Sequence, residues 1–162
     1  TAVWFRNPDK KVLDDVIPQN SSIKIEVKDG IEQSLVTGIK SDNSVKDIRS
    51  MFNNSLISIV DEEGNALDDT SIVGTGCVIQ LMNGDNVNDS AVVMIKGDTD
   101  GTGTIDVLDM ETIQKSILGI GDSLSGVYKE AALLNGDDTD EVTVLDMEAI
   151  QKDILGIEKI NN

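Results

Sequence analysis

Apolar and polar residues alternate along short segments between residues 21 and 96, which is the pattern of half-buried β-strands. In SIKIEVK, for example, Ile23, Ile25 and Val27 fall on one face of the extended chain. Asn83-Gly84 lies between two such segments and is typical of a tight hairpin turn. The predicted strands are Ser22–Lys28, Leu35–Ile39, Leu56–Val60, Gly76–Met82 and Ala91–Lys96.

One helical pattern interrupts these strands. Apolar residues spaced three or four apart run from Val45 to Phe52. Ser44 precedes them and Asp47 follows Ser44 by three positions, as in a capping box. We therefore expect residues 21–96 to form a small α+β module, with one mixed sheet crossed by a single helix. An Ig-like sandwich is the alternative.

Two further helical patterns follow, and they are copies of one another. Residues 98–119 read DTDGTGTIDVLDMETIQKSILG, and residues 135–156, which begin 37 positions later, read NGDDTDEVTVLDMEAIQKDILG. Each copy has an acidic loop, a helix with one apolar face, and a glycine at the helix end. Such a dense repeat indicates a duplicated loop–helix unit. Between the copies, Ser125 is a candidate N-cap for a short third helix.

The predicted strand Ala91–Lys96 runs directly into Gly97 without a linker. We therefore expect an α+β module, residues 21–96, packed as one rigid body on an all-α unit, residues 97–162. Residues 1–20 contain the sole tryptophan, Trp4, and are predicted to be a linker or an edge strand.

The first loop carries the oxygen ligands that calcium prefers. Calcium takes roughly 6–8 oxygens, and a twelve-residue loop can supply them from alternate positions. Gly103, at position 6, permits the sharp turn that such a loop needs. The candidate ligands, at positions 1, 3, 5, 7, 9 and 12, are Asp98, Asp100, Thr102, Thr104, Asp106 and Asp109.

The second loop offers a similar but less acidic set. Its position 6 is Asp140 instead of glycine, and Asp138 and Asp140 are possible substitute ligands. An acidic turn that only caps the next helix is the alternative for both loops, but it leaves the repulsion among the first loop's carboxylates unexplained. Two calcium ions are thus expected. The candidate ligands in the second loop are Asn135, Asp137, Thr139, Glu141 and Asp146.

Across residues 97–160, the paired EF-hand-like segments GDTDGTGTIDVLDMETIQKSILG and NGDDTDEVTVLDMEAIQKDILG resemble a dockerin, the calcium-binding module of cellulosome-type assemblies. A closing Asp at position 12 is usual in that family. Thr at position 5 and the missing glycine in the second loop are departures. The module fused directly before the repeat resembles, by position only, the X-module that supports some dockerins.

The resemblance implies a partner, a cohesin domain of a scaffoldin or cell-surface protein. It also implies an extracellular location, in an anaerobic bacterium, for a parent protein acting on polysaccharide. The recognition positions of the family are the same residues in both copies, so we expect two binding orientations. Burial of the apolar members in the core is the alternative. The positions are Val107, Leu108, Gln114, Lys115, Leu118, Gly119, Val144, Leu145, Gln151, Lys152, Leu155 and Gly156.

Composition narrows the function classes. The net charge of −17 argues against nucleic acid and anionic membranes as partners. The chain has no histidine, which is the commonest general base in enzymes. We therefore expect no enzyme activity in this segment, although the parent protein could carry a catalytic domain elsewhere.

Cys77 is expected to be a small core residue. Without an initiating Met or a signal peptide, the chain is expected to be a fragment or a processed form. The alternative function is a calcium sensor or structural module of a bacterial cell-surface protein.

Overall fold

A five-stranded sheet organises the first part of the chain. The computed structural model describes residues 11–53, 56–137 and 139–161. β2 runs parallel to β5, and the other neighbouring strands are antiparallel, so the sheet is mixed. In spatial order the strands are β1 (Lys24–Glu26), β2 (Leu35–Thr37), β5 (Asn86–Val93), β4 (Val78–Asn83) and β3 (Ile57–Val60).

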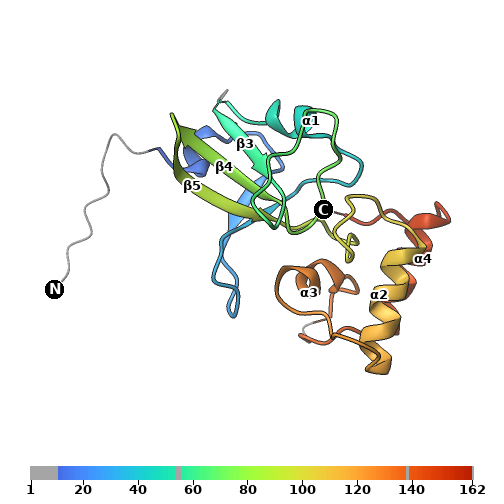
Figure 1. Ribbon diagram of the computed structural model, residues 1–162. Coiled ribbons are helices and arrows are strands. Elements are labelled where there is room, and N and C mark those ends of the chain that lie inside the picture. Colours follow the sequence, from blue (N-terminus) through green and yellow to red (C-terminus); the bar gives the residue numbers. More distant parts are fainter. Residues whose placement is uncertain (1–10, 54–55, 138, 162) are drawn as a thin grey trace.

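Helices lie beside the sheet and beyond its end (Figure 1). The short helix α1 begins with the predicted capping box, because Ser44 Oγ accepts from the Asp47 N–H and Asp47 Oδ2 accepts from the Ser44 N–H. The pair α2 and α4 lies side by side, away from the sheet. The helices are η1 (Leu13–Val16, a 3₁₀-helix), α1 (Val45–Arg49), α2 (Val107–Leu118), α3 (Gly126–Ala132) and α4 (Val144–Ile154).

The two faces of the sheet are covered by different helices, because successive strand side chains point to opposite faces. On one face Val36 belongs to the main apolar cluster, which also holds Ile48 of α1. On the other face its neighbour Leu35 packs in a cluster with Ala131 of α3. The next residue of α3, Ala132, packs instead with α2 and α4. α3 therefore joins the sheet to the helix pair.

The expected fold class, an α+β module packed on an all-α dockerin-like unit, is wrong. The described chain is one mixed α/β protein with a five-stranded mixed sheet and four α-helices. Its helical segments are not a separate layer, because α3 packs on β2 through Ala131 and Leu35. The alternative Ig-like sandwich is also wrong, since the described strands belong to a single sheet.

The N-terminal segment contributes to the core. Leu13 and Val16 of η1 are buried in the main apolar cluster, so this part of residues 1–20 is not a free linker. Trp4 and the rest of residues 1–10 lie outside the described residues. Cys77 is half-buried against the same cluster.

Candidate metal centre

The first acidic loop leaves the end of the sheet and folds back against the segment of residues 72–76. The backbones approach closely: a Cβ on Gly74 would lie 2.0 Å from the Gly101 carbonyl oxygen, and one on Gly103 would lie 2.5 Å from the Val73 carbonyl oxygen. Gly103 also has a φ of +83°, which favours glycine. The sequence therefore needs these glycines to dock the loop on the sheet.

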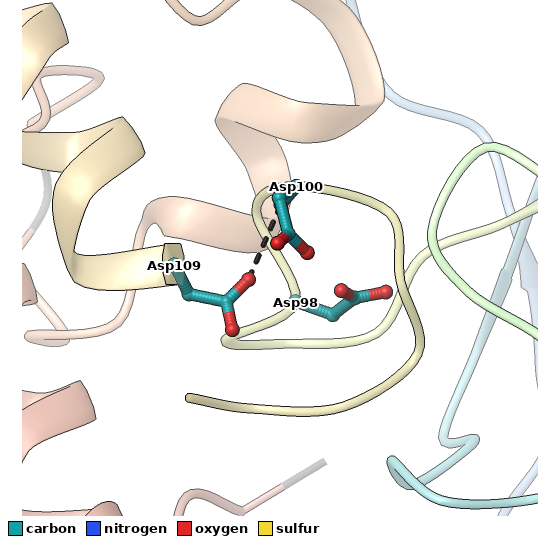
Figure 2. A group of neighbouring side chains, drawn as sticks. All are labelled: Asp98, Asp100 and Asp109. Atoms are coloured by element: carbon teal, nitrogen blue, oxygen red, sulfur yellow. Dashed lines mark hydrogen bonds between the residues drawn. The ribbon is translucent and has the colours of Figure 1, made fainter. Parts of the chain in front are cut away.

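Three carboxylates of this loop converge. Side-chain oxygens of Asp98, Asp100 and Asp109 lie within 4.8 Å of one another, and Figure 2 shows the three carboxyl groups close together beside the start of α2. Asp98 and Asp109 are fully buried, and Asp100 is partly buried. Three like charges at this spacing repel strongly in a buried setting, so the arrangement favours a bound cation.

Asp98 supplies the clearest geometric sign of a cation site. Its Oδ2 accepts from the N–H groups of Thr75, at 2.7 Å, and Gly103, at 3.0 Å. Its Oδ1 is buried and, in the part of the chain that is described, has no hydrogen-bond partner. An unsatisfied buried carboxylate oxygen is costly, and a cation in the cluster would remove that cost.

Asp109 closes the loop and begins the helix. Its Oδ1 accepts from the N–H groups of Thr99 (2.8 Å) and Asp100 (3.2 Å), and its Oδ2 accepts from the Asp106 N–H (2.8 Å). These bonds tie both ends of the loop to one side chain. The same carboxylate near a helix N-terminus is favoured by the helix dipole.

Burial raises the pKa of both carboxyl groups. Desolvation is the largest cause in each case; it raises the pKa of Asp98 to about 6 and that of Asp109 to about 7, against opposing backbone hydrogen bonds. The nearby Asp100 charge raises both pKa values further. A divalent cation would reverse this balance by favouring the charged forms.

The other three predicted ligands of the first loop have protein partners. Thr102 donates its hydroxyl to Asp100 Oδ1 at 2.8 Å. Thr104 donates its hydroxyl to Asp42 Oδ1 at 3.0 Å. Asp106 is the N-cap of α2 and accepts from the Leu108 N–H at 2.9 Å. The Thr102 hydroxyl also lies 3.3 Å from the Thr104 carbonyl oxygen, which accepts from it. The structure thus brings together three of the six predicted ligands.

The second loop does not gather its predicted ligands in this way. Asp146 is fully buried, and, like Asp109, it accepts from backbone N–H groups through both oxygens: Oδ1 from Leu134 and Asn135, and Oδ2 from Thr143. Glu141 is exposed. Among the described residues, a cluster of three Asp, Glu, His or Cys side chains that could hold a metal occurs only in the first loop. Asp138, a predicted substitute ligand, lies outside the described residues.

Sequence reasoning missed the residues outside the first loop that hold it in place. Thr75 holds Asp98 through its backbone N–H. Asp42 binds Thr104 through its carboxylate and donates its own N–H to the Gly103 carbonyl at 2.7 Å. Because almost every residue has a backbone N–H, the identity of Thr75 in the sequence could not show that it donates to Asp98. Asp42 lies in a turn with a φ of +65°, a conformation that Asp tolerates better than most residues. Its type therefore suggested a turn in the sequence but gave no sign of a contact with the first loop.

The predicted partner-binding residues lie at the surface in both copies. The apolar members match in exposure: Val107 and Val144 are 65% and 59% exposed, and Leu118 and Leu155 are 61% and 63% exposed. Leu108 and Leu145 are also exposed. The alternative of burial in the core is therefore wrong for these six side chains. The polar members and glycines, Gln114, Lys115, Gly119, Gln151 and Gly156, are exposed, and Lys152 is partly buried.

The surroundings of the two helices differ. A groove of about 750 Å³ runs along α2 and is lined by Val107, Gln114, Lys115 and Leu118, among others. On α4 a smaller pocket of about 490 Å³ lies between the helix and the C-terminal segment that includes Glu158 and Ile160. The two faces therefore present the same side chains with different neighbours.

In comparisons with protein-family models, curated proteins and solved structures, nothing matches this chain. No helix in the described ranges has the length and apolar character needed to cross a membrane. The geometry defines a candidate site for a hard cation, with a pair of exposed apolar helix faces beside it.

Proposed function

We propose that this chain is a non-catalytic, calcium-dependent adaptor that binds a cohesin-type domain. In this role it anchors its parent protein into a cellulosome-like extracellular complex. The observation that carries the proposal is the matched exposure of the duplicated side chains. A pair of helices that each expose two leucines and a valine presents more apolar surface than a lone soluble helix needs.

The two copies bury and expose the same positions of their helices. Ile113 and Ile150 occupy equivalent positions and are both fully buried between the helices. Leu118 and Leu155, also equivalent, are both about 60% exposed. Folding therefore uses the inner face of each copy and leaves the outer face free. An exposed apolar face that recurs in both copies suits recognition by a partner better than it suits stability.

Calcium enters the proposal through the start of α2. Asp109 holds the loop against the helix N-terminus, and Val107 and Leu108 are the first residues of that helix. A cation shared by Asp98, Asp100 and Asp109 would fix the orientation of these two exposed side chains. Partner binding at α2 should therefore depend on calcium, because the metal orders the surface that the partner contacts.

The equivalence of the helices supports two binding orientations. Lys115 and Lys152 form i,i+4 ion pairs with Glu111 (2.7 Å) and Glu148 (3.4 Å). Such exposed pairs are worth about 0.3–0.5 kcal/mol, so either lysine can be given up to a partner at little cost.

Isothermal titration against a panel of cohesin domains tests the proposal. We expect binding in calcium and weaker binding in chelator, because the face on α2 then lacks the metal that orders it. Lys115→Ala or Lys152→Ala alone should change the affinity less than threefold, and the double variant should weaken it more than tenfold. Lys28→Ala, an exposed lysine beyond β1, is the matched control. A large loss from one single variant would contradict two orientations.

The sensor alternative has its own outcome in this experiment. A calcium sensor exposes an apolar groove only after binding the metal and then captures an amphipathic helix. Binding of an amphipathic peptide in calcium, with no cohesin bound by any panel member, would replace the adaptor proposal with that one.

A further inference from the structure

The two loops occupy equivalent positions in the repeat, but their backbones differ at the turn. In the first loop Gly103, at position 6, has a φ of +83°. The equivalent residue in the second loop is Asp140. In the described part of the chain the single non-glycine residue with a positive φ is Asp42, so Asp140 does not make the same turn. The second loop therefore does not bring the carbonyl at position 7 inward as the first loop can.

The second loop also has a weaker set of charges. Position 1 is Asn135 where the first loop has Asp98, and position 9 is Thr143 where the first loop has Asp106. Calcium affinity in such loops falls when there are fewer charged ligands. Thr143 is already engaged as the N-cap of α4, where its hydroxyl accepts from the Leu145 N–H.

The polar groups of the second loop satisfy one another. Asn135 donates its side-chain N–H to Asp137 Oδ2 at 2.6 Å and accepts from the Asp137 N–H at 3.1 Å. Two further sets of bonds are common to both loops: Asp137 and Asp100 each accept from the threonine two positions later, and Asp146 and Asp109 each accept from backbone N–H groups through both oxygens. The difference between the loops therefore lies at position 1. Within the described residues, the unsatisfied buried oxygen of Asp98 in the first loop has no counterpart here.

A lysine brings positive charge to the second loop. Lys129, on α3, places Nζ 3.1 Å from Asp140 Oδ2. In the first loop the equivalent position is Gly103, which carries no charge to pair. The carboxylate at position 6 is thus directed at a side-chain cation and away from the interior of the loop.

We propose that the chain binds a single calcium ion, in the first loop, and that the second loop is a metal-independent turn closed by Lys129 and its own hydrogen bonds. The proposal deepens the proposed function and rests on it for the first site. It follows that α4 keeps its N-terminus without calcium, whereas the start of α2 depends on the metal. Calcium removal would then affect one binding face before the other.

Native mass spectrometry and isothermal titration with calcium chloride, at about 1 mM free metal as suits extracellular modules, count the ions. The whole chain should bind one ion. Asp98→Asn should lower the affinity about tenfold or more, with circular dichroism as the check on folding. Asp137→Asn, the same substitution at position 3 of the second loop, where the residue is exposed, should leave the stoichiometry at one. Two ions bound by the wild-type chain would overturn the inference. Binding of none would instead contradict the proposed function.

A gain-of-site variant tests the stated cause. Asn135→Asp, Asp140→Gly and Lys129→Met together restore the charge and the glycine and remove the competing cation. This variant should bind two ions. If it still binds one, these three residues are not the reason for the empty second loop, and the explanation fails. Amide resonances provide a separate readout: on calcium addition those of residues 98–109 should shift, and those of residues 139–146 should not.

Discussion

At the scale of single residues, the spacing of acids predicted the carboxylates that converge but not the groups that hold them. Asp98, Asp100 and Asp109 follow from a twelve-residue pattern, because that pattern places alternate side chains toward one point. Asp106 satisfies the same pattern, yet it caps α2. A side chain that can either bind a metal or cap a helix gives the same sequence signal, so the pattern alone could not separate these roles.

The raised pKa values of Asp98 and Asp109 predict how the calcium-free protein responds to pH. Both pKa values lie above the ordinary value of 3.8, at about 6 and about 7. A group of this kind stabilises the fold most below its unfolded pKa, and that contribution is lost as pH rises through the folded pKa. In EGTA the melting temperature should therefore fall between about pH 5 and pH 8.

Thermal melts followed by circular dichroism measure this trend, and Asp98→Asn is the control. The variant removes one of the two buried acids, whereas general repulsion from the net charge of −17 remains. Its melting temperature should change less across the same pH range. A melting temperature that rises from pH 5 to pH 8 in EGTA would contradict the buried, uncompensated state of these carboxylates.

At the scale of elements, the helices were predictable because their signals are local. The capping box at Ser44 and the glycine after α2, Gly119 with a φ of +68°, mark helix ends in the sequence and in the structure alike. Strand ends were less predictable. β5 begins at Asn86, five residues before the apolar run at Ala91, because its first residues pair with β4 through backbone bonds that polar side chains do not reveal.

The helix pair predicts a sharp contrast between inner and outer positions. Ile113→Ala or Ile150→Ala should each destabilise the protein by about 2–5 kcal/mol, because each leaves a cavity between the helices. Leu118→Ala and Leu155→Ala should each change stability by less than about 0.5 kcal/mol, because both side chains are mostly exposed.

Urea unfolding in saturating calcium measures all four free energies under one condition. The leucine variants are the matched controls, since Leu→Ala removes as many carbon atoms as Ile→Ala and does so from the same helix. A loss of more than about 2 kcal/mol from either leucine variant would show that the leucine is a core residue in solution. The expected pattern would leave Leu118 and Leu155 free to serve a partner.

At the scale of the whole molecule, the sequence did not show which element joins the sheet to the repeated helices. The repeat and the strands were visible separately, which suggested two units meeting at Gly97. The joining element is α3, a short helix whose adjacent residues Ala131 and Ala132 pack in different clusters. Alanine is compatible with almost any neighbour, so its identity could not show that the helix faces the sheet on one side and the helix pair on the other.

The same connection predicts one unfolding transition. Thr75 holds Asp98 and Asp42 holds Thr104, so the first loop cannot open without breaking bonds to the sheet segment. Calcium bound in that loop should therefore raise the melting temperature of the sheet and the helices together, since a ligand stabilises every part that unfolds with its site. Differential scanning calorimetry should give a single peak with equal calorimetric and van't Hoff enthalpies.

Asp42→Ala should reduce the increase in melting temperature that calcium causes. Two peaks, with the metal moving only one, would instead support the predicted boundary between residues 96 and 97.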